Sequence, residues 1–361
     1  MRTHARLTTL VTAAAAGSLL LGGCSLAGGD GGTDAGAPSA EQREDGTGRV
    51  VLVTHDSFAL PDDVVADFEE RSGIELVQRA AGDAGSLTNR LVLTKDDPIG
   101  DVAFGVDNTF ASRALEEDVF APHEAELPAG ADAFALADGA DRLLPVDEGN
   151  VCVNVDEAWF AERDQEPPAT LDDLLDPAYA DLTVLPGAPT SSPGLAFLLT
   201  TVAAYGEDWP TYWEDLVANG AKITSGWSDA YQVDFTAGGG GGDRPVVVSY
   251  DSSPAFTVAD GETTTSALLD TCYQQVEYAG VLTGAENPAG AAEVVDFLLS
   301  EEVQAALPES MYVYPVRDDV ELPRDWARFA EQPSDPFEVD PAEVAANRAD
   351  WLAEWSDVTS R

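Results

Sequence analysis

The sequence is poor in basic residues. Its 361 residues include 18 Lys and Arg against 66 Asp and Glu, which gives a formal net charge of −48, and its lysines are Lys95 and Lys222 alone. A protein that binds the phosphate backbone of DNA or RNA needs a basic surface. The composition therefore excludes a nucleic-acid partner, whereas an acidic surface favours solubility and attracts cations.

Metal-site and hydrolase patterns are also absent. The three histidines, His4, His55 and His123, do not have the spacing of metal ligands. The G-x-S-x-G pattern of a nucleophilic serine does not occur. The glycine run at 238–242 lacks the Lys-Ser/Thr pair of a phosphate-binding loop. We therefore expect neither a metal nor a cofactor.

Long apolar runs are missing beyond the N-terminus. Arg2 and Arg6 precede the apolar residues 7–21, which form a stretch too short for a comfortable membrane span. A basic start followed by a short apolar run is typical of a leader peptide. The sequence thus predicts an exported protein with no other membrane-spanning segment.

The leader ends in a pattern that carries a cysteine. Leu21-Gly22-Gly23-Cys24 is similar to a bacterial lipobox, in which the leader is cut before a cysteine that then carries lipid. We predict a signal peptide over residues 1–23, lipidation of Cys24 and a flexible tether over residues 24–48, which are rich in small and acidic residues. These features place the protein outside the cytoplasm, anchored to the outer face of the cell membrane. An ordinary secretory leader with an incidental cysteine is the alternative.

The rest of the chain alternates short apolar strands with amphipathic helices. Such alternation predicts an α/β fold with a mostly parallel sheet and helices on both faces, and the length predicts two lobes. The expected strands are 50–53, 74–78, 102–106, 184–186, 222–224, 246–250 and 312–316. The expected helices are 62–72, 86–93, 193–205, 288–299 and 341–355.

Polar side chains follow two of the predicted strands. Asp56 and Ser57 come after the first strand, and Asp107 and Asn108 after the third. In open sheets of this kind, ligands bind beyond the carboxyl ends of the strands. Helix capping is the alternative role for each group, but two such clusters at successive strand ends favour a shared cleft.

Aromatic residues mix with polar ones in the middle of the chain. Trp227 and Tyr231 are four residues apart, and therefore share a face if that segment is helical. Tyr250, Ser252 and Phe256 follow the strand at 246–250. Burial in the core is the alternative for such aromatics. An aromatic cage near a carboxylate suits a flat, positively charged ring.

The turn at 189–194 opens a predicted helix. Ser191 lies in it, and the free N–H groups of a helix N-terminus can hold a phosphate. A plain capped helix is the alternative. Cys152 and Cys272 lie in two extended segments, and an exported, oxidising environment favours a disulfide between them. Two separate buried thiols are the alternative.

Several of these stretches resemble the periplasmic thiamine-binding proteins of ABC transporters. The resemblance runs in order along the whole mature chain. Its specific parts are the Gly-Trp-Ser-acid-Ala-Tyr stretch and the tail "PAEVAANRADWLAEW". The matching segments are His55–Phe58, Gly105–Asn108, Thr190–Gly194, Gly226–Tyr231, Ser249–Phe256, Tyr314–Val316 and Pro341–Trp355.

The resemblance implies a two-lobed, periplasmic-binding-protein-like (type II) fold with hinge strands. Lobe 1 comprises residues 49–147 and 278–361, and lobe 2 comprises residues 148–277. The two cysteines then lie in the hinge strands, which run side by side. The implied protein is a monomeric receptor that captures thiamine or its phosphates and delivers them to a membrane permease.

The resemblance also implies residue roles. Trp227, Tyr250 and Phe256 contact the ligand, Ser191 lies near the phosphate, and Asp56 and Ser57 face them from the other lobe. The sequence departs from the family at His55 and Phe256, where the family usually has tyrosine. Two alternatives stay open: a ferric-iron receptor of the same fold, and a thiaminase-like enzyme that uses one of the cysteines as nucleophile.

Overall fold

The computed structural model describes residues 46–123 and 125–360. The predicted signal peptide, the lipidation site Cys24 and residues 25–45 of the predicted tether lie outside the described residues. Within the described ranges, no helix combines the length and the apolar character that a membrane crossing requires.

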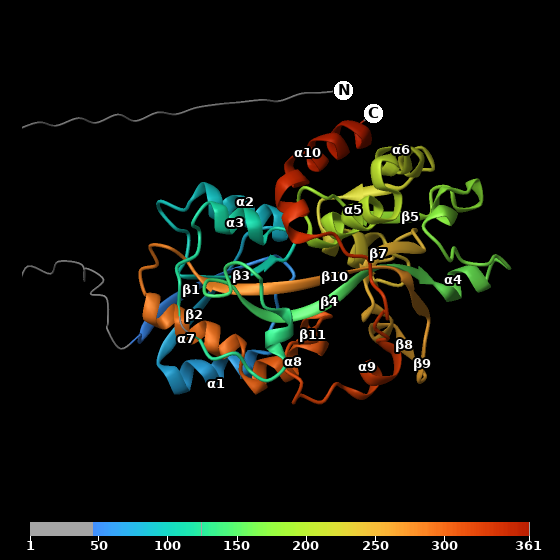
Figure 1. The fold of residues 1–361 in the computed structure, drawn as a ribbon. Coiled ribbons are helices and arrows are strands. Elements are labelled where there is room, and N and C mark those ends of the chain that lie inside the picture. The colour runs from blue at the N-terminus through green and yellow to red at the C-terminus, as the bar shows by residue number, and fades with distance from the viewer. Residues whose placement is uncertain (1–45, 124, 361) are drawn as a thin grey trace, which may run out of the picture. The chain divides into compact units, whose positions relative to one another are not determined.

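One large mixed sheet organises the fold (Figure 1). Its order is β2-β1-β3-β10-β4-β7-β5-β6, and β11 pairs with β4. Its strands are β1 Gly48–Thr54, β2 Ile74–Ala80, β3 Val102–Asp107, β4 Leu144–Asp156, β5 Thr183–Pro186, β6 Lys222–Thr224, β7 Val246–Tyr250, β10 Thr265–Val281 and β11 Tyr314–Pro315. A separate hairpin pairs β8 Val258–Ala259 with β9 Glu262–Thr263.

The sheet consists of two parallel halves joined by two long strands. In the first half β1 runs parallel to β2 and β3, and in the second half β5 runs parallel to β6 and β7. Between the halves, β10 is antiparallel to both β3 and β4, and β4 is antiparallel to β7. The expected parallel sheet is therefore confirmed within each half, while the joining strands are antiparallel.

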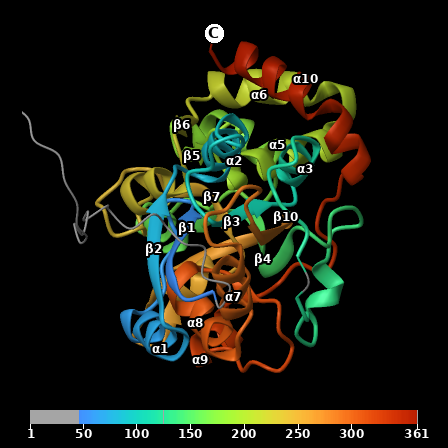
Figure 2. The same cartoon turned by 90° about the vertical axis from the view of Figure 1, so that its left-hand side faces the viewer.

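Helices cover both faces of the sheet. In both views α2, α3 and α5 lie on one face, and α1, α7 and α8 on the other (Figures 1 and 2). The helices are α1 Asp62–Ser72, α2 Ala84–Leu93, α3 Ala111–Glu116, α4 Glu157–Ala161, α5 Ser192–Tyr205, α6 Trp209–Ala218, α7 Pro288–Leu298, α8 Glu301–Met311, α9 Arg324–Phe329 and α10 Pro341–Thr359.

The C-terminal helix α10 packs on α6. The ring of Trp355 lies 5.4 Å from that of Trp213, in an edge-to-face arrangement. The chain thus ends against a helix of the segment 148–277, although the sequence groups residues 278–361 with the other lobe. The lobe boundaries themselves stay a prediction.

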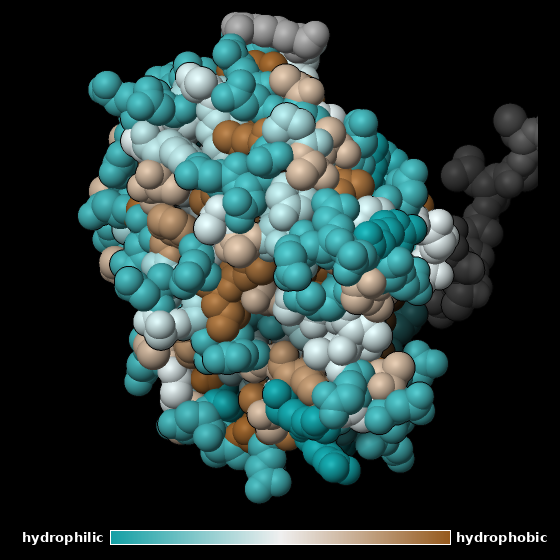
Figure 3. Space-filling model, turned by 90° about the vertical axis from the view of Figure 1, so that its right-hand side faces the viewer, coloured by the Kyte–Doolittle hydropathy of each residue, from teal (hydrophilic) through white to brown (hydrophobic). Residues whose placement is uncertain are grey.

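Apolar side chains lie mostly inside. Among the described residues, Leu93 and Val233 are the large hydrophobic side chains that remain exposed. On the face shown in Figure 3, hydrophobic residues form small groups among hydrophilic ones. Most apolar side chains of the described residues are therefore buried, and hydrophilic residues cover most of this face.

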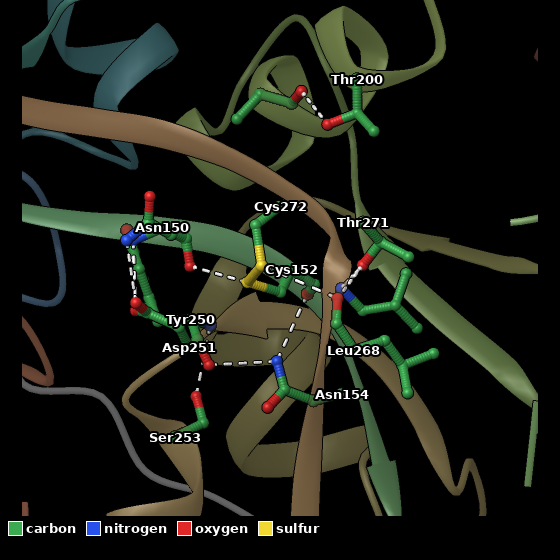
Figure 4. Close-up of a disulfide and its surroundings, with 12 residues drawn as sticks. Asn150, Cys152, Asn154, Thr200, Tyr250, Asp251, Ser253, Leu268, Thr271 and Cys272 are labelled. Atoms are coloured by element: carbon green, nitrogen blue, oxygen red, sulfur yellow. Dashed lines mark hydrogen bonds between the residues drawn. A yellow bond between two sulfur atoms is a disulfide. The ribbon is translucent and has the colours of Figure 1, made fainter. Parts of the chain in front are cut away.

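A disulfide links the two joining strands. Cys152 of β4 and Cys272 of β10 are bonded, with their Cα atoms 4.2 Å apart (Figure 4). The strand register shifts between Leu268 and Tyr273, beside the bridge. Thr271 spans this irregularity, because its hydroxyl accepts from Val153 N and donates to Leu268 O. The bridge therefore fixes the pairing of β4 with β10 at the point where their ladder is interrupted.

Candidate functional site

A small cavity lies where loops of the two half-sheets meet over the joining strands; we call it the central cavity. It encloses about 20 Å³, which is room for about one water molecule. Its lining combines aromatic, acidic and hydroxyl side chains with a few aliphatic ones. The lining residues are His55, Ser57, Asp83, Ser192, Pro193, Trp227, Tyr250, Glu277, Met311 and Val313.

The second half-sheet supplies an aromatic wall. Trp227 and Tyr231 stack with ring centroids 5.1 Å apart at 11°, so the expected shared face is present. A π-helical turn, Asp229–Asp234, follows Trp227 and carries Tyr231; such turns are frequent at functional sites. The indole Nε1 donates to Ser249 Oγ at 2.9 Å, and the ring of Tyr250 lies 6.3 Å away. Tyr231 thus packs against one face of the indole and Ser249 binds its Nε1, and together these contacts fix the orientation of Trp227.

The first half-sheet supplies His55 and Ser57 at the end of β1. Ser57 N donates to His55 Nδ1 at 3.1 Å, so the imidazole hydrogen resides on Nε2, which lies 3.5 Å from Glu277 Oε2. Burial is the largest influence on the pKa of His55 and lowers it, but the carboxylates of Glu277, Asp83 and Asp56 together raise it, and the net shift is upward. His55 thus directs a polar hydrogen at the carboxylate of β10.

Carboxylates gather at the base of the cavity. Asp83 accepts from Ala84 N at 2.7 Å and from Trp227 N at 2.9 Å. Burial raises the pKa of Asp83, although these N–H groups oppose the shift. Asp147 is fully buried, and burial together with the neighbouring Glu277 raises its pKa well above the usual range. Ionising several buried acids side by side is unfavourable, and a bound cation would relieve this cost, so the site favours a cationic ligand.

Several contacts tie the two halves together around the cavity. Ser57 Oγ lies 3.1 Å from Ser228 Oγ, and Gly85 N donates to Thr190 O at 3.1 Å. Gly85 is required at this approach, because a Cβ there would lie 2.6 Å from Pro189 O. The loops after β1 and β2 therefore touch the loops after β5 and β6 directly.

The structure brings three of the predicted ligand residues to the cavity, namely Ser57, Trp227 and Tyr250. Tyr231 stands behind Trp227. Asp56 lies just outside, where its Oδ1 accepts from Gly82 N at 2.9 Å. This contact ties the end of β1 to the loop after β2.

Three other predicted ligand residues, Asp107, Asn108 and Ser191, are buried or hydrogen-bonded within the fold and do not line the cavity. Asp107 is fully buried, and its carboxylate accepts hydrogen bonds from Thr109 N and from the hydroxyl of Ser192. Asn108 exchanges hydrogen bonds with the β10 backbone, at Gln274 O and Val276 N. Ser191 is wholly buried at the N-cap of α5 and does not line the cavity.

The last two predicted ligand residues, Ser252 and Phe256, do not line the cavity; they contact Tyr312, whose ring packs against Trp227. Ser252 Oγ donates to Tyr312 O, and Phe256 stacks on the Tyr312 ring at 3.3 Å and 14°. That ring in turn lies 5.4 Å from Trp227. Phe256 borders a separate groove beside Trp326.

Sequence reasoning missed part of the lining. Asp83 follows β2 as Asp56 follows β1, so the strand-end rule applied to that strand identifies it. Glu277 gives no such signal, because it lies inside a long strand whose alternation does not distinguish a buried carboxylate from an exposed one. The other missed lining residues are Ser192, Pro193, Met311 and Val313.

Buried acids make stability depend on pH. Burial raises the pKa of Asp107, Glu148 and Asp251 to about 7. A carboxyl whose pKa is higher in the folded state stabilises the fold at low pH, and this contribution is lost as pH rises from about 4 to about 7. We expect the melting temperature to be at least about 5 °C higher at pH 5 than at pH 8.

Differential scanning calorimetry across that range measures the effect. Repeating it in high salt screens the repulsion between surface acids but not the buried groups. Glu148→Gln removes one titrating group and should reduce the slope. A melting temperature that rises toward pH 8 would contradict the assignment.

A family model, related sequences and a solved structure all match this chain and agree on one family. A sequence model of the family described as bacterial extracellular solute-binding protein matches residues 97–330. The chain is 31% identical over 321 residues to the thiamine-binding periplasmic protein of Escherichia coli, covering 86% of this chain and 94% of that protein. It is 29% identical to the thiamine-binding periplasmic protein of Brucella melitensis, with 90% and 95% covered. The fold matches a solved periplasmic thiamin binding protein with a TM-score of 0.75 at 30% identity, covering 87% of this chain and 96% of that one.

Proposed function

The chain belongs to the bacterial extracellular solute-binding proteins, and we propose that its ligand is thiamine, captured in the central cavity for import by an ABC transporter. Members of this family bind solutes outside the cytoplasm and are not enzymes. The related thiamine-binding proteins and the chemistry of the cavity both support thiamine as the solute.

One observation carries the proposal: an indole face lies beside buried carboxylates. Thiamine joins a neutral aminopyrimidine to a thiazolium ring, which is flat and permanently cationic. Trp227 offers the aromatic face, and Asp83 and Glu277 offer the negative charge. A cation over an aromatic ring gains roughly 0.5–2 kcal/mol, and the adjacent carboxylates add to this attraction.

Ligand entry requires the two halves to separate, because about 20 Å³ is far too little space for thiamine. We propose that residues 49–147 with 278–361 form one lobe, that residues 148–277 form the other, and that β4 and β10 bend between them. Helix α10 is the exception within 278–361, because it packs on α6 and would move with the second lobe. The Ser57–Ser228 and Gly85–Thr190 contacts then break on opening and form again on closing. Each is a single hydrogen bond, worth about 0.5–1.5 kcal/mol.

The mode of attachment is part of the proposal. Cleavage before Cys24 and lipidation of that residue would hold a monomeric receptor at the outer face of the membrane. Residues 24–48 would act as its tether and leave the lobes free to meet a permease. The Leu21-Gly22-Gly23-Cys24 pattern supports this arrangement.

The two alternatives lack support from the site. A ferric receptor needs several tyrosinates that converge on one point, but among the described residues Tyr250 is the one tyrosine that lines the cavity, and Tyr231 stacks behind Trp227. Among the described residues, no His, Cys, Asp and Glu side chains form a group that could hold a metal. Cys152 and Cys272 are bonded to each other, so neither offers the thiolate of a thiaminase-like reaction.

Tryptophan fluorescence tests the proposal. Thiamine should quench the emission of the purified protein in a saturable manner, since Trp227 lines the cavity. Ferric citrate should leave the visible spectrum without a tyrosinate–iron band. An iron band together with unchanged emission at millimolar thiamine would favour the ferric receptor instead.

A further inference from the structure

His55 is the one side chain that can carry a positive charge among the described residues lining the central cavity, because none of them is lysine or arginine. Strand β3 holds its ring in place. The Phe104 ring lies 5.4 Å away, and a Cβ at Gly105, where φ is 98°, would overlap the imidazole. The wall of the cavity therefore contains a titratable group in a fixed position.

Carboxyl groups surround His55 directly or act on it through Glu277. They are Asp56 of the same loop, Asp83 before α2, Asp107 at the end of β3, Asp147 of β4 and Glu277 of β10. The nearest, Glu277 Oε2, lies 3.5 Å from His55 Nε2. The phenol of Tyr250 stays neutral beside them, since burial raises its pKa well above the usual range. This acidic environment favours the protonated imidazole.

The hydrogen bond to Ser57 makes the opposite demand. Ser57 N donates to His55 Nδ1 at 3.1 Å, so Nδ1 must offer a lone pair. An imidazolium carries a hydrogen on each nitrogen and has no lone pair to offer. Protonation therefore breaks this bond and directs two N–H groups at each other. With a cavity of about 20 Å³, the structure thus holds the neutral imidazole.

The same loop forms part of the contact between the two half-sheets. Phe58 N donates to His55 O at 3.3 Å, which closes a turn around Ser57. Ser57 Oγ lies 3.1 Å from Ser228 Oγ of the other half. A protonated His55 would push Ser57 N away and weaken this contact. The charge of His55 is therefore linked to the closure of the cavity.

We propose that His55 is a positioning residue that exchanges a proton for the cationic ligand, being protonated in the open, empty receptor and neutral when the lobes close on thiamine. The inference rests on the proposed function and adds a proton to its binding step. The proton leaves Nδ1 for the solvent, and Nδ1 then accepts from Ser57 N. The thiazolium takes over as the positive charge beside Glu277 and Asp83. Two cations in one buried site repel each other, so the ligand itself favours loss of the proton.

The affinity for thiamine should therefore fall on acidification. A group whose pKa is lower in the bound state than in the free state weakens binding as pH falls through its free-state pKa. We expect the Kd at pH 6 to be at least about threefold higher than at pH 8. The fold should become more stable over the same change, because of its buried acids, so unfolding does not produce this loss.

Calorimetric titration of the intact protein with thiamine in phosphate and in Tris counts the proton. These buffers take up protons with different enthalpies, so the difference in apparent binding enthalpy gives the number released. The net shift in the pKa of His55 is upward from an ordinary value of about 6.5. We therefore expect release of roughly half a proton or more per thiamine at pH 6.5. This measurement uses the wild type and needs no variant.

A histidine variant identifies the group. His55→Asn keeps an acceptor close to the place of Nδ1 but cannot be protonated near neutral pH. It should abolish the proton release and reduce the change in Kd between pH 6 and pH 8 to less than about twofold. The matched control is His123→Gln, because His123 is the other histidine of the described ranges and does not line the cavity. It should behave as the wild type does.

The outcomes separate this inference from the proposed function. Thiamine binding without proton release, at equal affinity at pH 6 and pH 8, overturns the role of His55 and leaves thiamine as the ligand. Proton release that persists in His55→Asn assigns the proton to a carboxyl group and overturns that role as well. Absence of thiamine binding at every pH overturns the proposed function itself. Release from the wild type and His123→Gln, but not from His55→Asn, supports both.

Discussion

Replacing Trp227 with alanine should weaken thiamine binding by about 5- to 150-fold, or on the order of 1–3 kcal/mol. The variant removes the aromatic face of the cavity and the Nε1 bond to Ser249. It also exposes Tyr231, against which the indole stacks. Titration calorimetry gives the affinity, and urea unfolding in parallel shows whether the fold survives.

Two further variants make the result specific. Trp227→Phe keeps a ring at the same place and should retain most of the affinity. Trp159→Ala removes a tryptophan of α4 that stacks with Arg163 and does not line the cavity. An effect of Trp159→Ala on affinity as large as that of Trp227→Ala would show that loss of any tryptophan acts through folding.

Removing the disulfide should lower the free energy of unfolding by about 2–5 kcal/mol. The bond joins residues 120 apart in sequence, and a crosslink over so long a segment strongly restricts the unfolded chain. We therefore expect the Cys152→Ala, Cys272→Ala double variant to unfold at lower urea than the wild type. Thiamine affinity should stay within about threefold, since neither cysteine lines the cavity.

Chemical modification provides the control for that variant. In denaturant without reductant, the peptides that contain Cys152 and Cys272 should resist alkylation, and both should react after reduction. Reduced wild type should then unfold like the double variant. Equal unfolding midpoints for oxidised protein, reduced protein and variant would show that the bond does not stabilise the fold.

The sequence predicts well those helices and strands whose ends are determined by neighbouring residues, such as a proline before a helix or a glycine after it. Helix α1 was predicted at its observed limits, because Pro61 precedes it and Gly73, with φ 71°, ends it. The strands β1 and β3 were found from short apolar runs that are buried on both faces. Helix α8 was missed, since Pro308 lies inside it. The expected strand at 312–316 shrinks to Tyr314–Pro315, and Tyr312, at φ 66°, ends α8.

The site was only partly predictable, because it depends on contacts between distant segments. Trp227 and Tyr250 stood out through composition and resemblance, and both line the cavity. Glu277 and Asp147 acquire their roles only when β10 and β4 pair, which places two carboxylates together in a buried position. Asp107 shows the opposite case, where a polar residue at a strand end serves the fold by capping the turn into α3.

A calorimetric titration of the purified protein with thiamine tests the central claim most directly. The account predicts saturable heat with a stoichiometry of one thiamine per chain, and a negative heat-capacity change as apolar surface is buried. The absence of heat at millimolar thiamine, from protein whose folding is verified by its unfolding transition, would contradict it.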